Sequence, residues 1–328
     1  MTDQTGLKLV DLDEAGVDRA FRADVLAGMR EEQKAIPARW LYDDAGSQLY
    51  EDITQVPEYY PARAETQILQ ERGSDFAEAI GPARAVVEFG SGSSVKTPAL
   101  LSAIDPAAYV PLDIAGDFLR AAAADLSAKF PGLPVFPVEA DFMRRVELPE
   151  EVADMPKLGF FPGGTIGNMV ARTATDLLRT MRETLGEGSM LLVGMDLIKD
   201  TRVLEAAYDD AGRVTAEFNL NLARRINREL GGTIPVDKLE HAARWNDQFA
   251  RIEMHLVAQE DITFEIAGEE FAMKAGETIH TENSHKFDRR SADKQLLAGE
   301  WTPVGRWLDR EERFSVVLAE ASIPRSAP

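Results

Sequence analysis

A glycine-rich turn follows an apolar run in the first third of the chain and offers a place for a ligand. The run 86–89 leads into Gly90-Ser91-Gly92. Glycines at such a turn let the backbone approach a ligand and bend sharply into the next helix. A dinucleotide fingerprint would place a third glycine at position 95, where the chain has Val95, so pyrophosphate binding is disfavoured. The turn fits S-adenosylmethionine (SAM) better, because SAM has no pyrophosphate.

Further residues after the next apolar runs suit an adenosine ligand. Asp113 ends the run 109–114, where a carboxylate accepts both ribose hydroxyls or, alternatively, caps a helix. Asp141 and Phe142 suit an adenine amino group and ring, although from the residues alone a loop turn with a core phenylalanine is the preferred explanation. Lys96 opens a predicted helix, where a cation is unfavourable unless an acidic group, such as the SAM carboxylate, faces it. From the residues alone, a solvated lysine is the default explanation.

The segment 160–168, FFPGGTIGN, adds backbone and amide groups at the carboxyl end of another apolar run. Gly163 and Gly164 expose backbone N–H groups, and Asn168 offers both a donor and an acceptor. The Asn/Asp-Pro-Pro-aromatic motif of amide and nucleobase methylases is absent, as is any His-x-x-x-His spacing. The sequence therefore predicts no metal site, and it predicts structural or surface roles for the four scattered histidines: His241, His255, His280 and His285.

The elements that position these residues alternate between helix and strand. Apolar runs predict strands at 83–90, 109–114, near 134–139, at 157–161 and at 190–197. Helices are predicted between them at 62–80, near 95–104, at 116–130 and at 172–185. Short buried strands separated by helices are typical of βαβ units and a doubly wound parallel sheet. Ligands of such sheets bind at the carboxyl ends of the strands.

The remaining segments depart from this alternation. We expect helices at 16–30, 45–54, roughly 200–230 and 286–298. We also expect an extended loop at 58–60, an antiparallel meander at 248–282 and a C-terminal hairpin at the sheet edge. The fold class is thus α/β, with a core at 61–196 and 287–328. A discontinuous α+β domain at 8–60 and 197–286 would bind the substrate.

Composition narrows the possible partners. The 328 residues include 36 Lys and Arg against 56 Asp and Glu, a net charge of −20. This balance argues against nucleic acids and anionic membranes. Cysteine is absent, which excludes disulfides and thiolate chemistry. No apolar run approaches about 18 residues, and the N-terminal sequence has no signal-peptide pattern. We expect a cytoplasmic monomer acting on a small molecule.

At the level of motifs, the chain resembles the L-histidine Nα-methyltransferases of ergothioneine biosynthesis over nearly its whole length. The motifs are YDDAGS at 42–47, LYEDIT at 49–54, PEYYPARAE at 57–65, FPGGTIGN at 161–168 and TENSHKF at 281–287. The tyrosine-rich stretch and the proline–glycine–asparagine stretch are specific in combination, because neither is a general methyltransferase pattern.

The resemblance implies a class I SAM-dependent methyltransferase core with an added substrate domain, with SAM as cofactor and L-histidine as substrate. It implies SAM contacts at Gly90, Lys96, Asp113, Asp141 and Phe142. It implies histidine contacts at Tyr59, Gly163, Asn168, Tyr208, Glu282 and Ser284. The amine would be held by Tyr42, Tyr59 and Asn168. Tyr50 stands where related enzymes are expected to have Phe, and Asn283 and His285 are larger or more polar than expected, which bears on substrate preference.

The implied reaction is an in-line methyl transfer that needs a neutral amine about 3–3.5 Å from the methyl carbon. Because an α-amino group has a pKa near 8, no strong general base is required, and none is evident. Glu282 would accept one ring N–H of histidine and Ser284 would satisfy the other nitrogen. Two residues apart on a strand, they should point to the same face. Three transfers would give the betaine hercynine.

Three other functions are compatible with parts of the sequence. The same chemistry could act on another amino acid, such as tryptophan or a thiohistidine. An NAD-dependent oxidoreductase is disfavoured by Val95 and by the C-terminal hairpin. A non-catalytic SAM-binding protein would bind the cofactor and transfer no methyl group.

Overall fold

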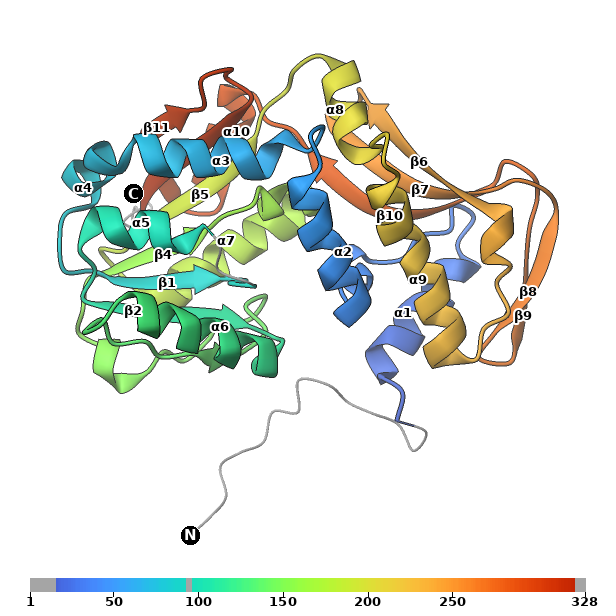
Figure 1. The fold of residues 1–328 in the computed structure, drawn as a ribbon, viewed down its shortest axis with the longest axis horizontal. Coiled ribbons are helices and arrows are strands. Elements are labelled where there is room, and N and C mark those ends of the chain that lie inside the picture. Colours follow the sequence, from blue (N-terminus) through green and yellow to red (C-terminus); the bar gives the residue numbers. More distant parts are fainter. Residues whose placement is uncertain (1–15, 93–95, 322–328) are drawn as a thin grey trace, which may run out of the picture. The chain divides into compact units, whose positions relative to one another are not determined.

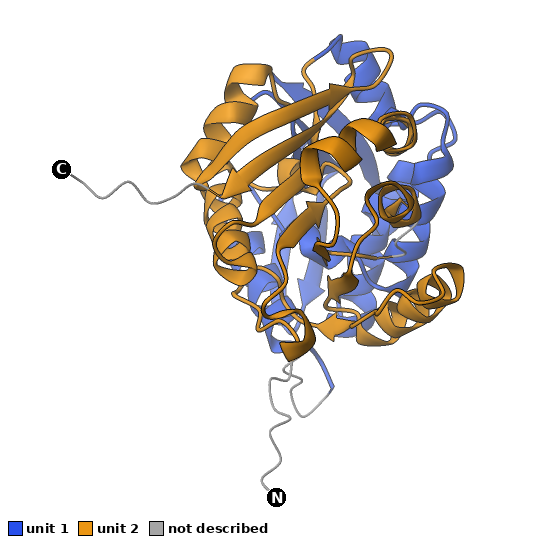
Figure 2. Cartoon of the chain, turned by 90° about the vertical axis from the view of Figure 1, so that its left-hand side faces the viewer, with its two compact units in different colours: residues 1–60, 199–285 blue, residues 61–198, 286–328 orange. Residues whose placement is uncertain are grey.

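A computed structural model describes residues 16–92 and 96–321, and these residues form two compact units (Figure 1). Unit 1 comprises residues 1–60 and 199–285, and unit 2 comprises residues 61–198 and 286–328 (Figure 2). Residues 197, 198 and 286 thus belong to unit 2, whereas the sequence assigned them to the substrate domain. The reason is local, because Leu197 bridges Phe287 and Lys286 pairs with Asp196. Residues 8–15 of the expected domain lie outside the described residues.

Unit 2 is built on a seven-stranded sheet in the order β11-β12-β5-β4-β1-β2-β3. Its strands are β1 (Ala85–Phe89), β2 (Ala108–Asp113), β3 (Val138–Glu139), β4 (Lys157–Phe161), β5 (Met190–Asp196), β11 (Trp301–Leu308) and β12 (Phe314–Ala321). The first five are parallel, and β12 pairs antiparallel with β5 and β11. Every residue of β1 and β5 is buried, which explains their continuous apolar runs. The predicted doubly wound core and edge hairpin are confirmed.

The helices of unit 2 connect these strands. They are α3 (Tyr60–Glu71), α4 (Gly73–Ile80), α5 (Thr97–Ile104), α6 (Gly116–Lys129), α7 (Ala171–Leu185) and α10 (Arg289–Ala298), with short 3-10 turns η2 (Glu150–Val152) and η3 (Thr165–Asn168). The single helix predicted at 62–80 is wrong, because the chain breaks between α3 and α4 at Arg72. The extended loop predicted at 58–60 is also wrong at Tyr60, which begins α3. Pro61 lies in the first turn, where the missing N–H has no intrahelical partner to lose.

Unit 1 combines helices with two small antiparallel sheets. Its helical elements are α1 (Arg19–Arg30), η1 (Ala38–Leu41), α2 (Asp44–Gln55), α8 (Thr201–Tyr208), α9 (Val214–Leu230) and η4 (Val236–Lys238). Its strands are β6 (Leu239–Asn246), β7 (Arg251–Ala258), β8 (Ile262–Ile266), β9 (Glu269–Met273) and β10 (Thr278–His285). They form a three-stranded sheet, β10-β7-β6, and a separate pair, β8-β9.

Two predictions for unit 1 need correction. The meander at 248–282 is wrong, because β10 skips the β8-β9 pair and returns to β7, and because β6 was not predicted at all. The helical stretch at 200–230 is two helices, α8 and α9. Asp210 separates them, since its carboxylate accepts hydrogen bonds from the backbone N–H groups of Val214 (2.9 Å) and Thr215 (2.8 Å) and thereby starts α9. Among the described residues, no helix is long and apolar enough to cross a membrane.

Candidate active site

The glycine turn of unit 2 is built around the carboxylate of Asp113. One carboxylate oxygen accepts a hydrogen bond from Gly92 N at 2.9 Å, and the other accepts one from Ala115 N at 3.0 Å. The backbone N–H groups of Gly90 and Ser91 both donate to the Leu112 carbonyl. Asp113 therefore joins the ends of β1 and β2, next to the point between β1 and β4 where the strand order reverses. In open α/β sheets, that point is where ligands bind.

Gly90 and Phe142 are brought into contact at this turn. Gly90 has a φ of +71°, which favours glycine, and a Cβ atom there would lie 3.2 Å from Cε1 of Phe142. The Phe142 ring is half-buried, with its centroid 6.4 Å from that of Phe89 and 6.1 Å from that of Phe161. Asp141 accepts a hydrogen bond from Met143 N at 3.0 Å, which orders the loop after β3. A ring beside a glycine backbone is a surface on which an adenine fits.

Lys96 faces an acidic group of the protein itself. Its Nζ lies 2.5 Å from Oε2 of Glu65 on α3, a side chain that is 1% exposed. The same oxygen accepts a hydrogen bond from Gly163 N at 2.8 Å. Glu65 thus links the start of α5 to the segment after β4. Its carboxylate compensates the positive charge of Lys96, which would otherwise be unfavourable at the N-terminus of a helix. This role of Glu65 was not predicted from the sequence, although the residue lies within the PEYYPARAE motif.

The segment after β4 turns through two left-handed glycines. Gly163 has a φ of +85° and Gly164 a φ of +68°, and η3 then ends at the half-buried Asn168. Gly163 and Asn168 therefore belong to unit 2, whereas the other predicted histidine contacts belong to unit 1.

Glu88 is a second buried carboxylate that the sequence analysis missed. It is 2% exposed on β1, and its Oε2 accepts hydrogen bonds from Thr97 Oγ1 at 2.7 Å and Tyr109 OH at 2.5 Å. Burial raises the pKa of Glu88 to about 7, although both hydrogen bonds favour the ionised form. The side chain therefore changes its charge near neutral pH.

This pKa makes the stability of the fold depend on pH. An acid whose pKa rises on folding stabilises the native state below its unfolded pKa, and this contribution is lost as the pH rises through its folded pKa. We expect the free energy of unfolding to fall by about 3 kcal/mol between about pH 4 and pH 8 because of Glu88. In Glu88→Gln this fall should disappear, as measured by urea unfolding across that range. Replacement of the exposed Glu78 by Gln is the matched control, and a Glu88→Gln profile parallel to the control would contradict the assignment.

Unit 1 gathers four tyrosines, here called the tyrosine cluster: Tyr42, Tyr50, Tyr59 and Tyr208. Ring centroids are 5.6 Å apart for Tyr42 and Tyr50, 6.5 Å for Tyr50 and Tyr59, and 5.9 Å for Tyr59 and Tyr208. Phe218 of α9 packs 5.4 Å from Tyr42 and closes one side. The cluster draws on the residue after η1, on α2 and α8, and on the turn before α3, so segments far apart in sequence supply one group of aromatic rings.

Two polar side chains of β10 join the ends of this cluster. Ser284 Oγ lies 2.7 Å from Tyr208 OH, and Glu282 accepts a hydrogen bond from the Tyr42 hydroxyl. Glu282 is 7% exposed and Ser284 5%. Desolvation of the phenol, followed by the Glu282 carboxylate, raises the pKa of Tyr42, although 38% of this residue is exposed. Burial together with Tyr50 raises the pKa of Tyr59. Both phenols therefore remain protonated at neutral pH.

A β-bulge sets the direction of Glu282 and Ser284. His280 pairs with His255 across β10 and β7, but Glu282 pairs with Met254, so Thr281 is one residue extra. Since paired residues point to the same face, Glu282 and Ser284 share the face of Met254. The predicted common face is thus observed. Asn283 and His285 lie on the opposite face with Arg251 and Glu253, so they are not neighbours of the tyrosine cluster on this sheet.

The sequence matches known proteins over almost its full length. A family model described as histidine-specific, SAM-dependent methyltransferase matches residues 21–321. A histidine Nα-methyltransferase of Mycolicibacterium smegmatis is 38% identical over 92% of this chain and 94% of its own. That of Mycobacterium tuberculosis is 36% identical over the same shares. An ergothioneine biosynthesis protein of Neurospora crassa is 24% identical over 95% of this chain and 36% of its own. With a doubly wound core and a family match of this extent, the chain belongs to the SAM-dependent, histidine-specific methyltransferases.

Proposed function

We propose that the protein transfers three methyl groups in succession from SAM to the α-amino nitrogen of L-histidine and so makes hercynine, a step of ergothioneine biosynthesis. The observation that carries this proposal is the joining of Glu282 and Ser284 to the tyrosine cluster in unit 1. It places an acid, a hydroxyl and neutral phenols within one small region. That set suits an imidazole at one end of a ligand and an amine at the other.

SAM supplies a methyl group already activated on a sulfonium, so the protein has to bind, orient and exclude water. The residues of unit 2 fit this cofactor, because Gly90 leaves a backbone surface beside Phe142 that a Cβ atom would fill. Each carboxylate oxygen of Asp113 accepts one backbone hydrogen bond and keeps a lone pair for a ribose hydroxyl. Asp141 and Phe142 would hold the adenine, and Lys96 the SAM carboxylate. In this arrangement Glu65 positions Lys96.

The amine must be neutral to react, and the protein does not need a strong base to make it so. An α-amino group at the end of a peptide has a pKa near 8, and the ionised carboxylate of a free amino acid raises that value, so a minor fraction of the amine is neutral at neutral pH. Tyr42 and Tyr59 have raised pKa values, so they act as neutral hydrogen-bond partners rather than as bases. Together with Asn168 they would hold the amine. Tyrosine faces also attract a methylated ammonium by about 0.5–2 kcal/mol, which favours retention of the intermediates until the third transfer.

Selectivity for histidine would follow from hydrogen bonds at its ring. Glu282 would accept one ring N–H, and Ser284 would satisfy the second nitrogen. A site with buried polar groups rejects an analogue that leaves them unpaired. Tryptophan has a single ring nitrogen and would leave Ser284 without its ligand partner.

We also propose a cytoplasmic monomer, supported by the absence of cysteine and by a net charge of −20.

The direct test is mass spectrometry of the purified protein with SAM and each of the twenty amino acids, plus a thiohistidine. We expect mono-, di- and trimethylated histidine in succession, and trimethylated histidine as the end product. A Gly90→Ala variant is the matched control, because its added Cβ would meet Phe142 and should block SAM binding. Preferential methylation of another amino acid would overturn the substrate, and SAM binding without transfer to any amino acid would overturn catalysis.

A further inference from the structure

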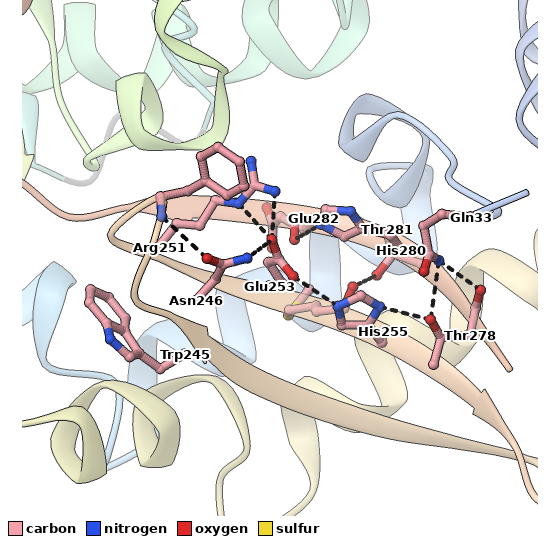
Figure 3. A network of polar contacts seen from close by, with 12 residues as sticks. Gln33, Trp245, Asn246, Arg251, Glu253, His255, Thr278, His280, Thr281 and Glu282 are labelled. Carbon is pink, nitrogen blue, oxygen red and sulfur yellow. Dashed lines mark hydrogen bonds and ion pairs between the residues drawn. The ribbon is translucent and has the colours of Figure 1, made fainter. Parts of the chain in front are cut away.

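The β10-β7-β6 sheet carries a cluster of possible metal ligands on the face opposite to Glu282 and Ser284. The cluster consists of Glu253, His255 and His280. His255 and His280 are direct cross-strand partners, and Glu253 precedes His255 by two residues on β7, so all three point to one face (Figure 3). The two imidazole rings stack with centroids 4.8 Å apart at 22°. One ligand atom from each residue lies within 4.8 Å of the other two.

Both imidazoles have hydrogen-bond partners outside the cluster, and for His280 these include the Asn283 side chain. His255 Nδ1 lies 3.2 Å from Thr278 Oγ1, and His280 Nε2 lies 3.0 Å from the Glu282 carbonyl oxygen. Such contacts fix the orientation of a ligating imidazole and leave its other nitrogen for an ion. Thr278 is fixed in turn by a hydrogen bond from Gln33.

The Glu253 carboxylate is arranged in the same way. Its Oε1 accepts hydrogen bonds from Arg251 Nε at 2.8 Å and from Asn246 Nδ2 at 2.9 Å. Its Oε2 lies 3.3 Å from His255 Nε2. One oxygen is therefore committed to neighbouring donors, while the other faces the imidazole across the cluster.

We propose that Glu253, His255 and His280 bind one divalent first-row transition metal ion, with Zn²⁺ as the reference ion. Two imidazole nitrogens and a carboxylate oxygen are a common ligand set for Zn²⁺ and its neighbours, with bonds of about 2.0–2.2 Å. Side-chain rotations would bring the three atoms to those distances from an ion between them. The remaining position would hold water.

The ion would stabilise the conformation of the bulge that sets the direction of Glu282. His280 precedes the extra residue Thr281, and its Nε2 contact reaches the Glu282 carbonyl on the other side of that residue. An ion bound to His280 and to two residues of β7 would therefore hold both sides of the bulge to the neighbouring strand. Its expected effect is on the stability of unit 1, which is measured without histidine or SAM.

The test starts from full-length protein dialysed against a chelator and titrated with ZnCl₂ in a calorimeter. We expect one ion per chain and a higher melting temperature in the zinc-bound form. Glu253→Gln and His280→Gln should each weaken binding at least tenfold. His285→Gln is the matched control, because His285 lies on the same strand and face as His280 but outside the cluster, and it should bind as the wild type does.

A second measurement covers variants that fold poorly. Co²⁺ added to the chelator-treated wild type should give visible absorption bands of a nitrogen- and oxygen-ligated ion, and Zn²⁺ should displace them. Absence of saturable binding in the wild type, or equal affinity in His280→Gln and His285→Gln, would overturn the proposal. Neither readout uses methyl transfer. A negative result here would therefore not contradict the proposed methylation of histidine, and a negative methylation assay would not contradict the metal site.

Discussion

Replacing Glu282 by alanine is expected to raise the KM for histidine by about 10- to 150-fold while the KM for SAM stays nearly unchanged. The range corresponds to the loss of a hydrogen bond to a charged group, about 1.5–3 kcal/mol. Glu282 is 7% exposed, so water does not readily replace its carboxylate. Steady-state kinetics with each substrate varied separately measures both constants.

Two further variants sharpen this test. Glu282→Gln keeps one acceptor oxygen but loses the charge, so its effect should be intermediate. Asn283→Ala is the matched control, because Asn283 is the next residue on β10 and faces the other side of the sheet. Its KM for histidine should stay close to that of the wild type. Equal increases in both KM values for Glu282→Ala would remove Glu282 from the recognition of the imidazole ring.

Replacing Lys286 by methionine is expected to lower the free energy of unfolding by about 3–5 kcal/mol. Lys286 Nζ lies 2.7 Å from Asp196 Oδ2, and the two side chains are 0% and 5% exposed. Removing one partner of a buried ion pair leaves the other charge buried without compensation. Urea unfolding monitored by circular dichroism gives the difference.

The double variant Lys286→Met with Asp196→Asn tests the cause. It removes both charges and keeps an acceptor for Leu197 N, which now donates to Asp196 Oδ1 at 2.9 Å. Much of the lost stability should return, because a neutral pair carries a smaller desolvation cost. If the single variant lost less than about 1 kcal/mol, or if the double variant were the less stable of the two, the pair would not have the role assigned to it.

The core of the fold was predictable because its strands are buried on both faces. Runs such as 190–195 are apolar throughout, which is typical of parallel strands covered on both faces. Unit 1 was harder to predict, since β6 reads LEHAARWN and lacks both an apolar run and a strict alternation. The conformation of β6 depends on its contacts with β7, α8 and α9. These elements are too far away in sequence for a local pattern to include them.

The residues of the site were likewise predictable where their neighbours are local in sequence, and were missed where their partners are distant. Gly90 and Asp113 follow directly from strand ends, so their neighbourhood is local in sequence. Glu65 was missed because its partner Gly163 is 98 residues away, and such pairing leaves no periodic signal. The extra residue Thr281 was invisible for another reason, since a bulge changes hydrogen-bond register without changing composition. Motif resemblance supplied Glu282 and Ser284, which spacing alone would have described as exposed.

The one-residue register shift in β10 also bears on how substrate choice could change during evolution. If the bulge closed without loss of a residue, Thr281 would pair with Met254 and the carboxylate of Glu282 would turn to the other side of the strand, while every amino-acid type stayed the same. A change of register in this strand can therefore switch which groups meet the ligand, in one step, where point mutations would need several. Divergence of specificity among proteins of this architecture is thus open to changes in strand register as well as in side-chain identity.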